Sequence, residues 1–381
     1  MIVTLTPNPS IDRTVLVENL LPGEVNRAVS SRIDPGGKGV NVAHALIRNG
    51  HPARAVLPLG GPDGELLARL LQNAGVPFDA VPIAGTTRTN IAIVDPAGVT
   101  TKVNEPGPEL SPDEVERLGK AVDGATGPVV LCGSLPPGTD EAFLAGMIAR
   151  HPGRVAVDTS GAPLAAAVAA KPWLIKPNRE ELSELTGREL PTLRAVVDSA
   201  RELIASGIGV VVVSLGSDGA LWVDSDDIHH ARATVTEPRS TVGAGDCLLA
   251  GVLSALTAGG DPATALGRGV AWGAAAVALP GSAVPGPEDI AAVTVTSTPC
   301  SPAEYGQPEH RQGKPMTTRT AIIASSVGLH ARPASLFVQK VTRSGLPVTI
   351  SRPGGKPVNA ASMLAVMSLG VKCGEEVELS C

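Results

Sequence analysis

The sequence has few aromatic residues and cysteines that form no obvious pairs. Only three Trp, one Tyr and three Phe occur among 381 residues, which argues against recognition of nucleic-acid bases by stacked aromatic side chains. The formal net charge of -6 argues against binding to a phosphate backbone. The five cysteines are odd in number, scattered and free of any C-x-x-C pair, so neither a disulfide scaffold nor a zinc site is indicated. We expect reduced thiols in a cytoplasmic protein.

Long hydrophobic runs are also missing. The N-terminal residues MIVTLTPNPSID have no basic segment followed by an apolar run, so no signal peptide is predicted. The uncharged stretch 269–286 is rich in Ala, Gly and Pro and is interrupted by Pro280 and Pro285, whereas membrane insertion needs about 20 strongly apolar residues. It predicts a buried helix followed by a loop, and no membrane insertion.

The chain divides into two parts of opposite charge. At roughly 100–200 residues per domain, 381 residues predict two domains. Residues 1–291 have a net charge of -10, residues 292–316 are neutral, and residues 317–381 have a net charge of +4. The middle segment is rich in Pro, Ser, Gly and Gln without apolar periodicity, which is typical of a flexible linker. We therefore predict a large domain over 1–291, a linker over 292–316 and a small domain over 317–381.

The first part alternates short β-branched runs with segments of helical spacing. The predicted strands include Val129–Leu131, Arg154–Val157, Trp173–Ile175 and Val210–Val213, and the predicted helices include Glu141–Arg150, Glu180–Leu185 and Leu193–Ala205. This alternation predicts an α/β fold with a mostly parallel sheet and helices on both faces. Ligands of such sheets bind beyond the carboxyl ends of the strands.

The segment STVGAGD (240–246) precedes a run of helical character. Its two glycines let the backbone approach an anion, and the N-terminus of the following helix supplies free N–H groups. Asp246 would place a carboxylate beside that pocket, which is an arrangement for phosphoryl transfer. A simpler interpretation is that Asp246 only favours the helix N-terminus and that the glycines form a turn. A P-loop and a Rossmann glycine pattern are both absent.

Two further turns carry polar residues. In DPGGKGVNVA (34–43), Lys38 and Asn41 near a helix start could hold a phosphorylated or hydroxyl-rich ligand. Alternatively, Asn41 caps the helix and Lys38 is solvated. In KPNREE (176–181), Asn178 and Glu181 have the spacing of a capping box, so the residues alone favour a structural role there.

Seven motifs, in order, resemble the ribokinase-type sugar kinases of the PfkB family. They are TPNPSID (6–12), PGGKGVNVA (35–43), RTN (88–90), GSLPPG (133–138), KPNREEL (176–182), SLGSDGAL (214–221) and STVGAGD (240–246). The resemblance covers about residues 1–290 and is strongest for the phosphosugar branch, above all bacterial 1-phosphofructokinases. It implies a ribokinase-like three-layer α/β/α domain with a small β lid.

The resemblance also implies a reaction and roles for individual residues. The γ-phosphoryl group of ATP, with Mg²⁺, would pass to the C6 hydroxyl of fructose 1-phosphate, with Asp246 as general base. The implied anion hole consists of Gly243, Ala244 and Gly245. The implied sugar-phosphate contacts are Asp12, Arg27, Gly37, Lys38, Asn41, Arg88 and Ser134, although Arg88 could equally be a surface charge. The implied nucleotide contacts are Asn178, Ser214, Gly216, Gly219 and Thr241, with Glu181 acting through Mg²⁺ and its water.

Residues 317–381 carry a resemblance of their own. GLHARPA (328–334) and VNAASMLAVMSLG (358–370) resemble the histidine-containing phosphocarrier protein HPr of the phosphotransferase system. The resemblance implies a phosphoryl group on His330, supported by Arg332, and regulatory phosphorylation at Ser362. Enzyme I and fructose-specific transporter components would be partners. The pattern ends before the last helix of that fold, so we expect an incomplete open-faced α/β sandwich. From residue type alone, His330 could simply lie near a helix cap and Ser362 could be an N-cap.

Two functional hypotheses remain at this point. The first is a kinase tethered to a phosphocarrier, which is coherent because fructose imported by the phosphotransferase system arrives as fructose 1-phosphate. The kinase motifs alone leave tagatose 6-phosphate and fructose 6-phosphate as alternative substrates. The second is a non-catalytic phosphorelay or regulatory protein acting through His330, against which the intact STVGAGD argues. The extended segments Val15–Leu20 and Ala92–Val103 could form a lid and, as in some relatives, a homodimer contact.

Overall fold

A computed structural model describes most of the chain. The described residues are 1–96, 99–299, 318–323, 337–338, 341, 348–355, 357–360, 366 and 369–380. His330, Arg332 and Ser362 lie outside them. The chain forms two compact units, Met1–Pro308 and Glu309–Cys381, and each is described by itself.

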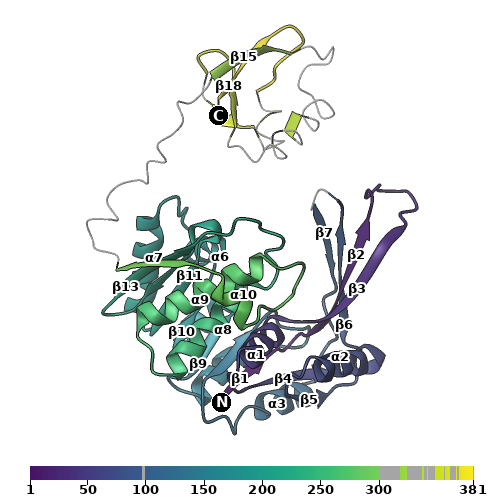
Figure 1. The fold of residues 1–381 in the computed structure, drawn as a ribbon, viewed down its shortest axis with the longest axis vertical. Helices are drawn as coiled ribbons and strands as arrows, with labels where there is room; N and C mark the ends of the chain where they lie inside the picture. Colours follow the sequence, from purple (N-terminus) through teal and green to yellow (C-terminus); the bar gives the residue numbers. More distant parts are fainter. Residues whose placement is uncertain are drawn as a thin grey trace. The chain divides into compact units, whose positions relative to one another are not determined.

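The first unit is built on a ten-stranded sheet with the order β14-β13-β12-β11-β10-β9-β8-β1-β4-β5 (Figure 1). From β11 to β5 the neighbouring strands are parallel, and β12, β13 and β14 continue the sheet antiparallel from β11. The strands are β1 Ile2–Leu5, β4 Ala53–Leu59, β5 Phe78–Pro82, β8 Val129–Cys132, β9 Val155–Asp158, β10 Leu174–Ile175, β11 Val210–Ser214, β12 Ala220–Val223, β13 Ile228–Ala233 and β14 Val295–Pro299.

Helices cover both faces of this sheet. Side chains alternate along the strands, so that Val210 and Val212 enter one hydrophobic core while Val211 and Val213 enter the other. The first core is completed by α1 Lys38–Arg48, α2 Gly61–Asn73, α8 Ala244–Thr257 and α9 Pro262–Val277, with α10 Pro287–Ala291 packed at its edge. The second is completed by α3 Pro112–Lys120, α4 Ala142–Arg150, α5 Gly161–Ala169, α6 Arg179–Thr186 and α7 Leu193–Ala205. The predicted three-layer α/β/α fold is confirmed.

A second sheet of four strands, here called the small sheet, stands beside the main sheet (Figure 1). Its order is β3-β2-β6-β7, with β2 Ser10–Val17, β3 Ala28–Gly36, β6 Arg88–Val94 and β7 Thr100–Asn104. Strand β2 runs parallel to β6 and antiparallel to β3, which places Asp12 opposite both Asp34 and Asn90. Of the two extended segments noted in the sequence, the first contributes Val15–Val17 to β2, and the second contributes the end of β6 and most of β7.

The linker predicted over 292–316 is wrong in its first part. Residues Val295–Pro299 form β14, which pairs with β13 in register from Val295 opposite Ala233 to Pro299 opposite His229. The composition of the segment concealed this strand, because an edge strand needs backbone pairing on one side only and little apolar periodicity. The division into a large domain, a linker and a small domain stays a proposal with that change.

The uncharged stretch 269–286 forms the second half of α9 and a loop, as predicted. Among the residues that the structure describes, no helix is both long enough and apolar enough to cross a membrane. Helix α9 instead packs against α8 at close range: a Cβ at Gly251 of α8 would lie 2.8 Å from the Cα of Gly269 in α9. Glycine at this crossing lets the two backbones approach, and the contact fixes α8, which begins at the STVGAGD turn.

The second unit contains a four-stranded antiparallel sheet with the order β15-β18-β16-β17. Its strands are β15 Thr318–Ile322, β16 Thr349–Ser351, β17 Val358–Asn359 and β18 Glu376–Ser380. A small core covers this sheet and includes Val341, Ile350, Ala360, Val366, Val371 and Val377.

Candidate active site

Polar residues gather where the parallel strands of the main sheet end. Asp158 is the last residue of β9, Lys176 directly follows β10, and Ser214 is the last residue of β11. Ser134 follows β8 by two residues. Because these strands are parallel neighbours, their carboxyl ends lie at one edge of the sheet, which is where α/β proteins bind ligands.

Asp246 lies in the first turn of α8 and is 6% exposed. Gly243 is the N-cap of this helix and has φ 77°, a left-handed conformation that glycine adopts without strain. Asn41 of α1 donates a hydrogen bond from Nδ2 to Oδ2 of Asp246 at 2.8 Å. Burial, together with the negative charge of Asp158, raises the pKa of Asp246 to about 7. The carboxyl group is thus poised to accept a proton near neutral pH.

Two lysines share the carboxylate of Asp158. Lys38 Nζ lies 2.8 Å from Oδ1, and Lys176 Nζ lies 3.2 Å from Oδ2. Burial opposes the charged form of Lys38, but the charge and hydrogen bond of Asp158 outweigh it and raise the pKa of Lys38 above its usual value. The same two lysines outweigh the effect of burial on Asp158 and lower the pKa of its carboxyl group. Lys38 and Asp158 are therefore both charged at neutral pH.

The first turn of α1 brings Lys38 and Asn41 to the site. Gly37 is the N-cap and has φ 120°, so the suggestion that Asn41 caps this helix is wrong. The suggestion that Lys38 is simply solvated is wrong as well, because its ammonium group is paired with Asp158 and lies 4.0 Å from Oε1 of Glu181.

The base of the small sheet supplies a second set of polar groups. Asp12 Oδ1 accepts hydrogen bonds from Ser10 Oγ at 2.7 Å and from Asn90 Nδ2 at 3.2 Å. Arg88 is half-buried and donates to the backbone carbonyls of Glu105 and Asn8, so it is not an ordinary surface charge. Strand pairing sets Arg88 opposite Ser10, two positions from Asp12.

Four predicted nucleotide contacts lie at the end of β11 or in the turns after β10 and β11. Asn178 is the N-cap of α6 and forms a reciprocal capping box with Glu181, as the spacing predicted. A parallel bridge joins Asn178 to Ser214, so the two segments lie side by side. Gly216 and Gly219 have φ 62° and 87° and form the tight turn after β11. A capping role does not exclude ligand contact, since the Glu181 side chain is 16% exposed.

Other predicted residues lie near the edges of this group. Thr241 is exposed in the turn before α8, and its carbonyl accepts from the N–H of Ala244. Ser134 is exposed, and its hydroxyl accepts a hydrogen bond from Asn8 Nδ2 at 3.2 Å. Arg27 is not brought to the others. It is exposed and precedes β3 at the end far from Asp34, a separation of seven residues, or about 23 Å along a strand.

Sequence reasoning missed Asp158 and Lys176 as site residues. Both are almost fully buried, at 1% and 4% exposure, and a charged side chain is rarely buried without a partner. The available signal was position, because each follows a short apolar run that was predicted as a strand. Lys176 was noted only as the first residue of the capping motif of α6 and of the family motif KPNREEL, without a role of its own.

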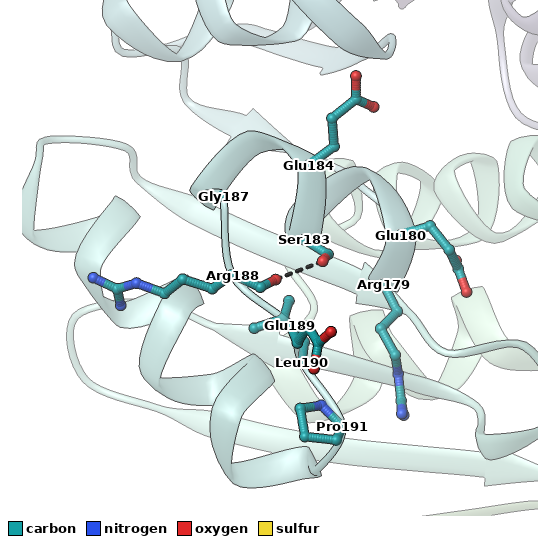
Figure 2. A pocket seen from close by; sticks show the side chains of 9 residues that line it. All are labelled: Arg179, Glu180, Ser183, Glu184, Gly187, Arg188, Glu189, Leu190 and Pro191. Atoms are coloured by element: carbon teal, nitrogen blue, oxygen red, sulfur yellow. Dashed lines mark hydrogen bonds between the residues drawn. The ribbon is translucent and has the colours of Figure 1, made fainter. Parts of the chain in front are cut away.

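A shallow hollow of about 670 Å³ lies along α6 and the segment that follows it (Figure 2). Its lining is mixed in charge and comprises Arg179, Glu180, Ser183, Glu184, Gly187, Arg188, Glu189, Leu190 and Pro191. None of the predicted site residues lines it. Three carboxylates against two guanidinium groups make it a poor site for a phosphorylated ligand, so we assign it no part in the active site.

Two family models match the chain. The model for the pfkB family carbohydrate kinase matches residues 7–289, which include Asp246, Asp158 and both lysines. The model described as the PTS HPr component phosphorylation site matches residues 317–381. The two matched segments do not overlap.

Curated relatives resemble the chain over most of their own length. The 1-phosphofructokinase of Rhodobacter capsulatus is 40% identical over 309 residues, covering 78% of this chain and 96% of the relative. The ATP-dependent 6-phosphofructokinase isozyme 2 of Escherichia coli is 38% identical over 285 residues, covering 72% of this chain and 92% of the relative. Phosphofructokinase-2 from Escherichia coli, crystallised in complex with substrates and products, is similar in structure with a TM-score of 0.73 and 36% identity over 76% of this chain and 97% of that one.

The fold, the buried carboxylate at the N-terminus of α8 and these comparisons agree. An ATP-dependent sugar kinase is the activity that the family implies, with a divalent metal as its companion. The chain therefore belongs to the pfkB family of carbohydrate kinases, and it carries a segment related to the HPr component at residues 317–381.

Proposed function

We propose that the chain transfers the γ-phosphoryl group of MgATP to the C6 hydroxyl of fructose 1-phosphate, giving fructose 1,6-bisphosphate. The observation that carries this proposal is the buried Asp246, held by Asn41 beside the glycine turn at the start of α8. The 1-phosphofructokinases of Rhodobacter capsulatus and Xanthomonas campestris, each 40% identical to this chain, support the choice of substrate.

Asp246 acts as the general base in this proposal. Its carboxylate takes the proton of the C6 hydroxyl as that oxygen forms a bond to the γ-phosphorus, while the bond from phosphorus to the leaving oxygen of ADP breaks. A pKa of about 7 suits this task, because the base is substantially ionised at neutral pH and still accepts a proton readily. The N–H groups of Gly243 and Gly245 at the start of α8, joined by that of Ala244 once it releases the carbonyl of Thr241, stabilise the charge on the transferring group.

The sugar phosphate is held between α1 and the small sheet. Asp12 and Asn41 present acceptor and donor groups for sugar hydroxyls, and Lys38 and Arg88 are the cations for the existing phosphate. Gly37 opens the turn that lets the ligand approach the backbone. Arg27 and Ser134 belong to the same proposed set, although Arg27 would require the small sheet to bend or a second copy of the chain to contribute it.

The nucleotide is held at the ends of β10 and β11 and by the turns that follow them, with Asn178, Ser214, Gly216 and Gly219 as its contacts, and by Thr241 in the turn before α8. Among the residues that the structure describes, no group of three His, Cys, Asp or Glu side chains could hold a metal ion alone. We propose Mg²⁺ carried mainly by the ATP phosphates, with the partly exposed Glu181 carboxylate binding a water of its hydration shell. This fits the donor set, because Mg²⁺ prefers oxygen ligands and keeps several waters. When bound, the ion neutralises phosphate charge.

The substrate is tested by a coupled assay with fructose 1-phosphate, fructose 6-phosphate and tagatose 6-phosphate at equal concentrations. We expect kcat/KM for fructose 1-phosphate to exceed the other two by about tenfold or more, since one phosphate contact of about 1.4 kcal/mol gives that ratio. Preference for fructose 6-phosphate would replace the proposed substrate. Absence of turnover with all three would favour the phosphorelay hypothesis.

We further propose that residues 317–381 carry a phosphoryl group on His330, with Arg332 supporting it and Ser362 as a regulatory site. The match of these residues to the HPr component supports the proposal. Enzyme I and the fructose-specific transporter components would be the partners. Incubation with phosphoenolpyruvate and enzyme I should give an acid-labile label that His330→Ala abolishes. A label that persists in this variant would refute the assignment.

The small sheet supports self-association. Among the described residues, six of the eight large exposed hydrophobic side chains lie in it or in its hairpins: Leu16, Leu21, Val25, Val29, Val99 and Val103. Such clustering is typical of a contact surface. A structurally similar protein, phosphofructokinase-2 from Escherichia coli, is known in a tetrameric inhibited form. We propose that two copies of this chain associate through their small sheets.

A further inference from the structure

Asp158 is a buried carboxylate that none of the proposed catalytic steps uses. It is 1% exposed, and its two oxygens are divided between two lysines from different segments. Lys38 comes from the first turn of α1, and Lys176 from the residue after β10. The N–H of Lys176 also donates to the carbonyl of Val157, next to Asp158 in β9. One side chain at the end of a central strand therefore joins two loops of the site.

The two lysines differ in where their ammonium groups lie. The side chain of Lys38 is 35% exposed, so it reaches from Asp158 to the open side of the site. The side chain of Lys176 is 5% exposed, and its Nζ lies only 3.2 Å from the position of a Cβ built on Gly245. Lys176 thus lies against the glycine turn of α8, one residue before Asp246, while Lys38 faces the space for the acceptor.

The two lysines are the cations that face the carboxyl groups of Asp158 and Asp246. Removal of Asp158 would leave Lys176 without its ion-pair partner, would leave Lys38 with only the more distant carboxylate of Glu181, and would remove a negative charge from the surroundings of Asp246. A buried lysine that loses its partner also loses the interaction that compensates for its desolvation. Asp158 therefore influences three parts of the site: Asp246, which accepts the proton, Lys38, which faces the sugar, and the glycine turn beside Lys176.

We propose that Asp158 is a positioning residue for phosphoryl transfer. It directs Lys38 toward the sugar phosphate, and it directs Lys176 toward the glycine turn that receives the transferring phosphoryl group. The inference rests on the kinase function proposed above and extends it to a residue and a cation that were given no role there. Asp158 acts through the two lysines and does not itself contact the substrate. Lys176 supplies a fixed positive charge beside Gly245, where charge develops in the transition state.

The pH dependence of turnover gives a readout that a purely structural role would not change. The charged or titratable groups that face Asp246 from other elements are Asp158 of β9, Lys38 of α1, Lys176 after β10 and Cys132 of β8; Cys247 adjoins it on α8. Asp158 raises the pKa of Asp246, and the two lysines lower it. Loss of Asp158 and loss of Lys176 should therefore shift the acid limb of kcat/KM in opposite directions.

The test compares Asp158→Asn, Lys176→Gln and the wild-type chain between pH 5.5 and 9 with MgATP and fructose 1-phosphate. We expect Asp158→Asn to lower kcat by about 100-fold, the cost of misplacing groups by about 1 Å, and to shift the acid limb to lower pH by about one unit. Lys176→Gln should shift it to higher pH. Acetylation of Lys176 by acetic anhydride, followed by mass spectrometry without any substrate, should increase several-fold in Asp158→Asn.

Glu114→Gln is the matched control. Glu114 is also a buried carboxylate, at 6% exposure, but it accepts hydrogen bonds from the N–H groups of Ser111, the N-cap of α3, and of Ala84. Its loss should therefore leave the pH profile unchanged. The proposal would be overturned if the acid limb of kcat/KM stayed at the wild-type pH in both site variants. It would also be overturned if Lys176 were acetylated no faster in Asp158→Asn than in the wild-type chain. If Asp158→Asn does not fold, the test rests on Lys176→Gln: a shift of the acid limb of kcat/KM to higher pH supports the proposal, and no shift or a shift to lower pH contradicts it. If the wild-type chain phosphorylates none of the sugar phosphates, the proposed function fails, and the acetylation experiment still reports whether Asp158 holds Lys176.

Discussion

Asn41 and Asp246 lie 205 positions apart in the sequence, yet Nδ2 of Asn41 donates a hydrogen bond to Oδ2 of Asp246 at 2.8 Å. The bond joins the first turns of α1 and α8, which both bring their N-termini to the site. A carboxylate that accepts a bond from a fixed amide has one orientation, so this contact positions the base for the incoming hydroxyl. It also lowers the pKa of Asp246, against the larger effect of burial.

Asn41→Ala should reduce kcat and shift the pH dependence. A hydrogen bond to a charged group contributes about 1.5–3 kcal/mol, which corresponds to a loss of about 10- to 100-fold in rate. Because the amide favours the ionised carboxylate, its removal should shift the acid limb of kcat/KM to higher pH. Steady-state kinetics between pH 5.5 and 9 measure both effects.

Asn49→Ala provides the control for this variant. Asn49 is the C-cap of the same helix, and its amide donates to the carbonyls of Ala45 and Pro285, away from Asp246. Its loss should reduce stability without changing the pH profile. Equal pH profiles for Asn41→Ala and the wild-type chain would contradict the role given to Asn41.

Asp246→Asn should lose activity and gain stability at neutral pH. Removal of a general base costs about 10²- to 10⁴-fold in rate. The pKa of Asp246 is higher in the folded chain, at about 7, than the ordinary value of 3.8. Its contribution to stability is therefore fully present below pH 3.8 and is lost as the pH rises through 7. At pH 8 the neutral amide avoids the cost of a buried charge.

Thermal unfolding of the wild-type chain and Asp246→Asn at pH 5 and pH 8 tests this sign. We expect the variant to unfold at least about 3 °C higher than the wild-type chain at pH 8, since 1 kcal/mol corresponds to about 2–4 °C in a domain of this size. The difference should shrink toward pH 5, where Asp246 is protonated. A larger gain at pH 5 than at pH 8 would show that the carboxyl group is not raised in pKa.

The sequence predicted the layers of the fold better than its edges. Runs such as Val129–Leu131 and Val210–Val213 are buried on both sides, so their composition alone indicates central strands. Strand β14 has no such signature, because its residues Val295–Pro299 are mostly exposed and only the pairing with β13 defines them. Edge strands of this kind depend on tertiary pairing that local sequence does not record.

Only part of the site was predicted, because some of its residues can be recognised from local sequence and others cannot. Asp246 and Lys38 lie in glycine-rich turns whose chemistry can be interpreted locally. The role of Asp158 is not local, because it exists only when β9, β10 and α1 bring its two lysines to it. In the sequence, such a residue is a charged side chain directly after an apolar run. Only the order of the strands shows which of these charged residues meet in one site.

Two helical glycines should respond in opposite ways to alanine. A Cβ at Gly39 in the first turn of α1 would overlap Thr6 Oγ1 and lie 3.3 Å from Cβ of Cys132, so Gly39→Ala should destabilise the chain by about 1–3 kcal/mol and reduce turnover through the neighbouring Lys38. A Cβ at Gly146 in α4 meets nothing within 4 Å, so Gly146→Ala should stabilise by about 0.5–1 kcal/mol. Unfolding in urea measures both changes, and a stabilising Gly39→Ala would contradict the packing described for α1.

Charged substitutions on the small sheet should dissociate the proposed dimer. Val29 in β3 and Val103 in β7 are 66% and 55% exposed, and aspartate at either position would place an unpaired charge in an apolar contact, at a cost that a modest interface cannot offset. Sedimentation velocity should show a dimer or larger assembly for the wild-type chain and a monomer for Val29→Asp. Ile322→Asp is the control, because Ile322 is similarly exposed, at 64%, but belongs to the second unit. The proposed contact would be contradicted if the wild-type chain sedimented as a monomer. It would also be contradicted if Val29→Asp sedimented with the same mass as the wild-type assembly.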